Sequence, residues 1–268
     1  MSIFDQKVIK YEMKPLSSLE KVFPDETPVY RMECQMLSGL WGETVSFQVA
    51  YTGDFVMRER LDVRVVSELA EHVHVRTVEM VPVGRATNGI VDDNYLKTIS
   101  GLYPDLLKDL KDGKVIVYSR QWRSLWVDVD ITNEIPAGKY EIELQLIKEG
   151  EVVCSAKQKV TVIGTELPKL DIMHTEWMHA DCLADYYHVE VFSEEHWKLL
   201  GNYFQEYVKR DCNMMLTPLF TSPLDTAIGL ERTTCQLIDV EVKDGEYVFG
   251  FEKLKRWIDL CKKCGIEY

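Results

Sequence analysis

The stretch Gly164-Thr165-Glu166-Leu167-Pro168-Lys169-Leu170-Asp171-Ile172-Met173-His174 decides the fold, because the pattern of the chain changes across it. Residues 164–168 have the glycine and proline that are typical of a connection. Residues 170–174 form a short apolar run that we interpret as a strand, and helix and strand patterns alternate after it. Almost all of the chain before it has a strand pattern. We therefore predict one domain at residues 1–164 and a second at residues 165–268.

The first domain is predicted to be an antiparallel β-sandwich. Apolar and polar residues alternate with a period of two, which indicates strands with one buried face and one solvated face. Turns containing glycine or proline separate these strands, as at residues 136–138. In the connection at 92–111, residues 105–110 are predicted to form a short helix. The clearest alternating segments are residues 44–51, 61–65, 72–76, 140–146 and 159–163.

The second domain shows a different order of elements. After the strand at 170–174 we predict a long loop at 175–192, a helix that begins after the N-cap Ser193, and a strand at 212–216. One face of this helix would carry Trp197, Leu200, Phe204, Tyr207 and Val208. A hairpin around Lys243-Asp244-Gly245-Glu246, a helix that ends at Gly265 and a strand from Ile266 follow.

This order predicts the opening βα units of a TIM-type (β/α)8 barrel, so the fold class is β followed by α/β. Two βα units cannot close a barrel or cover both faces of a parallel sheet. We therefore expect the barrel to be truncated in these 268 residues. The remainder would come from a longer chain or from a second chain.

Composition and charge limit the classes of function. The chain is 46% hydrophobic and 28% charged, which is typical of a globular protein with a real core. Its net charge of −13 argues against a nucleic-acid or anionic-membrane partner. Neither a signal peptide nor a transmembrane segment is expected from the pattern. Seven cysteines without framework spacing favour free thiols and a cytoplasmic location.

Two segments are candidates for ligand binding, because βα barrels bind ligands on the loops that follow the strands. The first contains Glu176, Trp177, His179 and Asp181. An indole offers an apolar face to a sugar ring, while imidazole and carboxylate groups can bind its hydroxyls. The alternative is that Trp177 packs against the sandwich and that His179 and Asp181 cap turns.

The second candidate segment, residues 217–233, contributes Thr217 and Arg232. The Glu231-Arg232 step could orient a substrate or clamp the loop, and we favour the clamp. Together with the first segment, this gives six predicted substrate-binding residues.

Other constellations favour structural roles. Cys261-x-x-Cys264 lies in a helix pattern without further ligands, which favours packing over a metal or redox site. His72-x-His74 favours a solvated strand face. Trp122 and Trp126 share a face, which favours core packing over an exposed sugar platform. We expect no metal and no cofactor, and no pair of carboxylates clearly qualifies for an ordinary glycosidase.

Several segments, taken together, are more specific than any one of them. They are residues 103–107, 121–127, 137–140, Trp177-Met178-His179-Ala180-Asp181, 216–220, 223–226 with 231–233, and 257–268. In these segments the chain resembles bacterial glycoside-hydrolase-like proteins related to family 123, the β-N-acetylgalactosaminidase family. The resemblance extends through nearly the whole chain and implies an N-terminal β-sandwich followed by a (β/α)8 catalytic barrel.

The resemblance also implies a retaining cleavage of N-acetylhexosaminides that is assisted by the acetamido group of the substrate. In that mechanism a consecutive Asp-Glu pair acts, in which Asp positions the acetamido group and Glu is the acid/base. The only Asp-Glu step here is Asp25-Glu26, in the sandwich region. We therefore expect no catalytic residue in this chain and no activity from it alone. A non-catalytic carbohydrate-binding or scaffolding protein is the competing interpretation.

Overall fold

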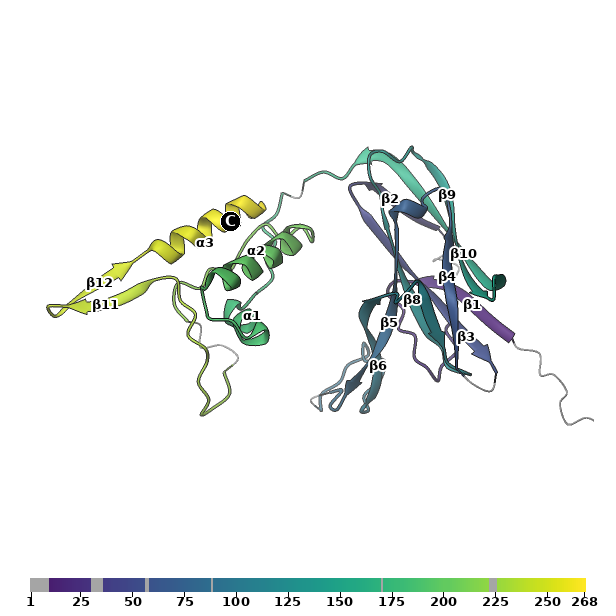
Figure 1. Ribbon diagram of the computed structural model, residues 1–268, viewed down its shortest axis with the longest axis horizontal. Coiled ribbons are helices and arrows are strands. Elements are labelled where there is room, and N and C mark those ends of the chain that lie inside the picture. Colours follow the sequence, from purple (N-terminus) through teal and green to yellow (C-terminus); the bar gives the residue numbers. More distant parts are fainter. Residues whose placement is uncertain (1–9, 30–35, 56–57, 88, 170, 222–225) are drawn as a thin grey trace, which may run out of the picture. The chain divides into compact units, whose positions relative to one another are not determined.

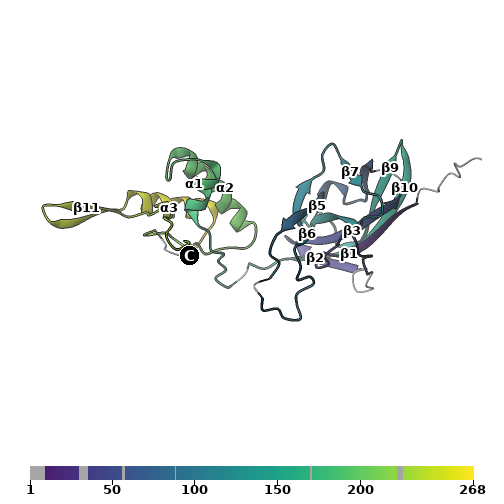
Figure 2. The same ribbon diagram turned by 90° about the horizontal axis from the view of Figure 1, so that it is seen from below.

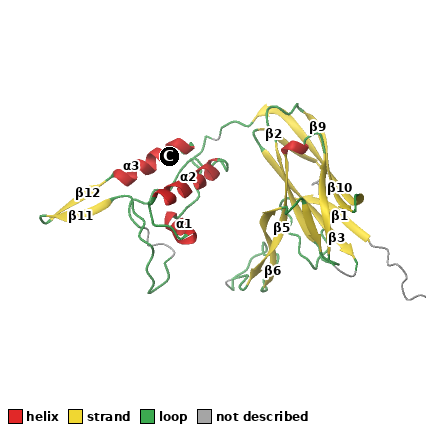
Figure 3. Cartoon of the chain, viewed as in Figure 1, coloured by secondary structure: helices red, strands yellow, loops and turns green. Residues whose placement is uncertain are grey.

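The computed structural model describes residues 10–29, 36–55, 58–87, 89–169, 171–221 and 226–268. The chain divides into two compact units, Met1–Pro168 and Lys169–Tyr268. Strands dominate the first unit, while the second contains three α-helices and a hairpin (Figures 1 and 3). Leu170 and part of the 223–226 segment quoted above lie outside the described residues.

The first unit consists of two five-stranded sheets that enclose one core. One sheet has the order β1 (Lys10–Ser17), β3 (Thr44–Asp54), β8 (Arg123–Asp130), β5 (Val73–Val83) and β6 (Gly101–Asp109). The other has the order β2 (Met36–Trp41), β10 (Glu151–Glu166), β9 (Gly138–Lys148), β4 (Glu59–Val66) and β7 (Lys114–Val117). A 3₁₀ turn at Ala70–His72 precedes β5.

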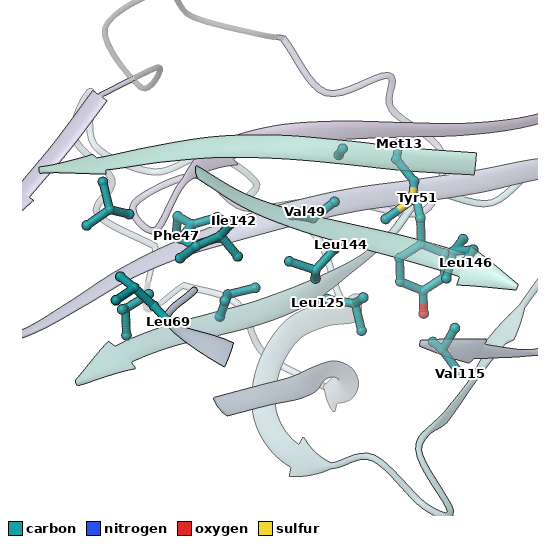
Figure 4. Packing of buried hydrophobic residues seen from close by; sticks show 14 of the residues in the cluster. Met13, Phe47, Val49, Tyr51, Leu69, Val115, Leu125, Ile142, Leu144 and Leu146 are labelled. Carbon is teal, nitrogen blue, oxygen red and sulfur yellow. The ribbon is translucent and has the colours of Figure 1, made fainter. Parts of the chain in front are cut away.

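The core of this unit follows from the alternation in the sequence. On β3, Phe47, Val49 and Tyr51 are buried, and on the facing sheet Leu144 and Leu146 of β9 are fully enclosed (Figure 4). Burying each such side chain stabilises a fold by about 2 kcal/mol. The alternating segments predicted from sequence all fall in strands, although 72–76 begins one residue before β5.

Three details of the first unit differ from the prediction. Residues 105–110 do not form a helix, because β6 runs through them and pairs with β5. The register shifts where Pro104 pairs with Met80, and an edge strand with such an irregularity tolerates proline. β2 pairs with β10 in parallel, so the sandwich is not wholly antiparallel. That pairing also extends β10 to Glu166, beyond the predicted end of the domain.

The second unit consists of α1 (Ala180–Tyr187), α2 (Glu194–Val208), α3 (Glu252–Cys264) and the hairpin of β11 (Asp239–Lys243) and β12 (Glu246–Gly250). The hydroxyl of Ser193 accepts a hydrogen bond from His196 N–H, which confirms the predicted N-cap. Gly265 ends α3 with a positive φ of 99°. The predicted faces of α2 and α3 meet in one apolar cluster, where Phe204 stacks edge-on against Trp257.

The loop predicted at 175–192 is not continuous, because α1 forms within it. α1 has only 8 residues, and its buried apolar residues are Ala180, Leu183 and Ala184, so the helix is too short to be recognised from its pattern. None of the helices in the described ranges is long and apolar enough to cross a membrane.

The predicted strands at 170–174, 212–216 and 266–268 are not formed as strands in the described residues. The segments nevertheless lie together and are joined by single hydrogen bonds around Asn213. Its side chain accepts from His174 N–H and donates to Ile172 O, both at 2.8 Å. Its carbonyl accepts from Glu267 N–H at 2.9 Å. Backbone bonds also join the segments, from Asn213 N–H to His174 O at 3.0 Å and from Met215 N–H to Tyr268 O at 2.9 Å, so the segments adjoin one another although they do not form regular strands.

Candidate functional site

A cavity of about 150 Å³ opens in the second unit, where the chain leaves the three extended segments. It brings together five of the six residues predicted to bind substrate: Trp177, His179, Asp181, Thr217 and Arg232. The other lining residues are Met178, Ala180, Leu216, Pro218, Phe220, Thr221 and Cys235. The two candidate segments, which are about forty residues apart in sequence, therefore line the same cavity.

Asp181 and Arg232 form the most ordered contact at this cavity. Arg232 donates from Nε to one carboxylate oxygen at 2.6 Å and from Nη2 to the other at 2.9 Å. The two side chains are only 8% and 13% exposed. Two parallel charge-assisted bonds of this kind fix both groups in orientation. Arg232 therefore holds the 217–235 segment against the first turn of α1, which is a clamping contact.

Trp177 and His179 lie at the open side of the cavity. The side chain of Trp177 is 65% exposed, and that of Phe220, which also lines the cavity, is 55% exposed. His179 is half-buried and occupies the N-cap position of α1 without capping it through its side chain. Exposed aromatic rings beside the enclosed Asp181–Arg232 pair are typical of a surface that binds a ligand with both an apolar face and hydroxyl groups.

Thr217 and Glu176 have different positions. Thr217 lines the cavity, and its hydroxyl donates to Met215 O at 3.4 Å. Glu176 is not part of the lining. Its carboxylate lies 3.6 Å from His174 Nε2 and is 71% exposed, and its carbonyl accepts from the Tyr207 hydroxyl at 2.6 Å. The structure therefore separates Glu176 from the other five predicted residues.

Several lining residues were not predicted from the sequence, and Cys235 is the clearest example. Its thiol is buried, which raises its pKa to about 12. The charge of Asp181 nearby contributes to this raised pKa, so the thiol stays protonated and is a poor nucleophile. Its backbone N–H donates to the Thr221 hydroxyl at 3.0 Å. Nothing in the sequence around Cys235 distinguishes it from an ordinary core cysteine.

His196 fixes the start of the helix that carries Asp181. It is fully buried, its Nδ1 accepts from Phe192 N–H and its Nε2 donates to Ala180 O, both at 2.9 Å. These partners require the neutral tautomer with the proton on Nε2. Burial lowers the pKa of His196. Because Ala180 begins α1, this histidine fixes the helix that carries Asp181.

The cysteine and histidine pairs noted in the sequence analysis make packing or surface contacts. Cys261 is buried beside Trp257, and Cys264 Sγ donates weakly to Gly201 O at 3.8 Å, so both cysteines pack against α2. His74 Nε2 lies 3.2 Å from a carboxylate oxygen of Asp130 on β8. In the part of the chain that the structure describes, no cluster of three or more His, Cys, Asp or Glu side chains could hold a metal ion.

The other two constellations lie in the sandwich unit. Trp122 is buried in a small cluster with Leu16, Val22 and Ala50. Asp25 and Glu26 both form ion pairs with Lys97, at 3.3 and 2.7 Å. This Asp-Glu step therefore belongs to a surface ion-pair group of the first unit.

Comparisons with known proteins identify the relatives of both units. Residues 177–268 match the family of the glycoside hydrolase 123 catalytic domain. All residues that line the cavity lie within this matched region. No curated protein matches the sequence.

The fold as a whole is similar to that of a family 123 glycoside hydrolase from Clostridium perfringens, studied for glycolipid glycan hydrolysis. The TM-score is 0.70 at 13% identity, over 97% of this chain and 46% of that chain. A β-glucosidase from Listeria innocua is similar over 60% of this chain and 17% of its own, at 10% identity and a TM-score of 0.27. The resemblance to family 123 is confirmed, and the chain spans less than half the length of the Clostridium protein.

Proposed function

We propose that this chain supplies the N-terminal β-sandwich and the first βα units of a (β/α)8 glycoside hydrolase. Its substrate would be an N-acetylhexosaminide, cleaved with retention by participation of the substrate's acetamido group. The match of residues 177–268 to a glycoside hydrolase catalytic domain and the similar fold over 97% of the chain support this proposal.

The observation that carries the proposal is the cavity beside Trp177. An exposed indole, a half-buried imidazole and a clamped carboxylate line one small hollow within the matched region. Stacking on the indole would bind the apolar face of a sugar ring. His179 and the carboxylate of Asp181 would bind hydroxyls, while Arg232 holds that carboxylate in position.

In this proposal, the described residues bind and orient the sugar and do not break the bond. The acid/base and the acetamido-orienting carboxylate would be a consecutive Asp-Glu pair on a later barrel strand. The Clostridium enzyme has a chain about twice as long as the part that this protein matches. The remaining barrel strands would therefore be provided outside these 268 residues.

The direct test is ligand binding by the whole chain. Titration with N-acetylgalactosamine should quench or shift the fluorescence of Trp177, and Trp177→Ala should weaken binding about tenfold. Tyr186→Ala is the matched control, because this ring is 76% exposed on α1 but does not line the cavity. Unchanged affinity in Trp177→Ala would place any sugar site elsewhere and contradict the proposal.

A second measurement tests the missing catalytic pair. The 268-residue chain should not release the aryl group from aryl N-acetylhexosaminides above the rate of buffer. Robust turnover by this chain would mean that its own carboxylates complete the reaction. The proposed division between binding and catalytic residues would then be wrong.

A further inference from the structure

A cavity in the first unit lies at the open edge of the sandwich, far in sequence from the sugar site proposed at Trp177. It has a volume of about 690 Å³ and is lined by strands β4 and β7 of one sheet and β5 and β6 of the other. β6 and β7 are the outermost strands of their sheets, so the two layers separate here. Figure 2 shows β5, β6 and β7 on this side of the unit. The volume is within the range of small-molecule sites.

The floor of this cavity is partly aromatic and apolar. Tyr51 extends from β3 toward Val115 on β7, and Figure 4 shows its hydroxyl directed at that residue. The hydroxyl donates weakly to Ile116 O at 3.4 Å. Burial raises the pKa of Tyr51, so it remains a neutral group at the bottom of the cavity.

The rim is rich in cations, although the whole chain carries a net charge of −13. Six basic side chains line it: Arg58, Arg60, Lys108, Lys111, Lys114 and Arg123. Two of them are already neutralised by carboxylates outside the lining. Arg60 pairs with Asp112 at 2.9 Å and Lys114 pairs with Asp62 at 3.1 Å.

The other four cations have no carboxylate within ion-pair distance among the described residues. Arg123 stacks over the Tyr118 ring with 5.0 Å to the centroid and donates to Gln121 Oε1 at 3.1 Å. Its Nε is inaccessible to solvent and lacks a hydrogen-bond partner in the described part of the chain. The Nε is therefore not the atom that faces the cavity, and an oxyanion there would bind the guanidinium through its terminal nitrogens.

Three carboxylates also line the cavity, and they do not cancel this charge. Glu59 is taken by Lys148 at 2.9 Å, and Tyr11 also bonds to it. Glu79 accepts from the Thr77 hydroxyl at 2.8 Å, and Asp109 lies at the exposed end of β6. Cations without a partner therefore exceed carboxylates without a partner, which leaves the cavity positive in an acidic protein.

We propose that this edge cavity binds a small molecule that carries a carboxylate, sulfate or phosphate group, with Arg123, Lys108 and Lys111 as the anion-binding side chains. The anionic group lies between Arg123 and the two lysines, and the remainder of the molecule lies over Tyr118 and Tyr51. This site is independent of the sugar site proposed at Trp177, since its residues all belong to the first unit.

The test is a titration of the ¹⁵N-labelled chain with inorganic sulfate, glucuronic acid, glucose 6-phosphate and, as a neutral probe, N-acetylgalactosamine, at constant ionic strength. At least one anionic probe should shift the amide resonances of β6 and β7, whereas the neutral sugar should not. The tightest probe identifies which oxyanion the site prefers. Absence of shifts with every anion would overturn the proposal.

Charge variants separate a built site from general attraction of anions. Lys108→Ala combined with Lys111→Ala should weaken binding about tenfold, because charge-assisted hydrogen bonds are lost. The control combines Lys139→Ala with Lys159→Ala, which removes the same charge from exposed positions on β9 and β10. Equal weakening in both variants would show that only net charge matters and would overturn the site.

Variants of Arg123 test the site even if Lys108 and Lys111 contribute little to the affinity for the anion. Arg123→Gln should also weaken binding about tenfold, whereas Arg123→Lys should restore only part of it, since an ammonium lacks the planar fork. Full affinity in Arg123→Gln, in a protein with an unchanged unfolding midpoint, would exclude the proposed anion position.

Discussion

Arg232 binds both carboxylate oxygens of Asp181, at 2.6 and 2.9 Å, and the two side chains are almost enclosed. The pair connects the start of α1 to a segment that follows Asn213 and Met215. Removing one partner of a buried charge pair is strongly destabilising, because water cannot solvate the charge that remains. It therefore defines both the shape of the cavity and the local stability of the second unit.

Asp181→Ala should destabilise the second unit by about 3 kcal/mol, because it removes both charge-assisted bonds to the Arg232 guanidinium while that group stays almost enclosed. Chemical unfolding followed by the fluorescence of Trp197 and Trp257, both in that unit's core, measures the change. Asp185→Ala is the control. Its carboxylate accepts a single bond from the Thr233 hydroxyl at 2.8 Å in an exposed position, so its loss should cost less than about 1 kcal/mol.

The double variant Asp181→Ala/Arg232→Ala completes the argument for the pair. If the two residues act as one clamp, the double variant should be less destabilised than the sum of the single variants. Additive losses would mean that each residue stabilises the unit through other contacts.

His196 should make the second unit sensitive to mild acid. Burial holds its pKa below the ordinary value of 6.5, so the unfolded chain binds the proton more readily than the folded chain. The stabilisation is therefore fully present above pH 6.5 and is lost as the pH falls from there toward the lowered pKa. Unfolding free energies measured from pH 7 to pH 5 should decrease.

The histidine can be separated from other titrating groups by variants. His196→Gln should remove most of this pH dependence. His188→Asn should keep it, since His188 is exposed and asparagine tolerates its left-handed backbone with φ of 55°. Carboxylates such as Glu194, whose pKa is lowered from 4.5 by Arg256, act only at lower pH. A pH-independent wild type between 7 and 5 would contradict the assignment.

Asn213→Ala should loosen the three extended segments that converge beneath the cavity. The substitution removes bonds to His174 N–H and Ile172 O, at a cost of about 2 kcal/mol. Hydrogen exchange at the His174 amide should accelerate markedly. The control Asn202→Ala changes an exposed residue of α2 and should not affect that amide. Unchanged protection in Asn213→Ala would show that the backbone bonds alone hold the segments.

Asn213 also shows where sequence reasoning reached its limit. Alternation predicted strands of the first unit because they have one buried face, as Ile142, Leu144 and Leu146 on β9 demonstrate. Periodicity predicted α2 and α3 for the same reason. The converging segments are held by a few backbone bonds and by the side-chain amide of Asn213, and these are tertiary contacts that no local pattern records.

The site was predictable in part. Trp177, His179, Asp181, Thr217 and Arg232 line one cavity because they follow neighbouring extended segments, as the loop rule for barrels anticipates. Glu176 shares the loop, but its carboxylate lies beside His174 instead of lining the cavity. The short edge strand β6 was mistaken for a helix, since its leucines at 106, 107 and 110 imitate helical spacing.

Two glycines of the second unit should respond oppositely to alanine. Gly265 ends α3 with φ of 99°, a conformation that alanine adopts with strain, so Gly265→Ala should cost about 1 kcal/mol. Gly201 lies inside α2, and an added Cβ would meet only Leu260 Cδ1 at an ordinary 3.5 Å. Because alanine is the better helix former, Gly201→Ala should stabilise the unit by up to about 1 kcal/mol.

Thermal unfolding of the two glycine variants beside the wild type measures both effects, and the sign of each is the diagnostic result. A loss of stability in Gly201→Ala would mean that α2 and α3 pack too closely at this point to accept a methyl group. An unchanged Gly265→Ala would mean that the chain after α3 can leave the helix in another conformation. Residues 266–268 would then lose their fixed approach to Asn213, and the amide of Glu267 should exchange faster in that variant.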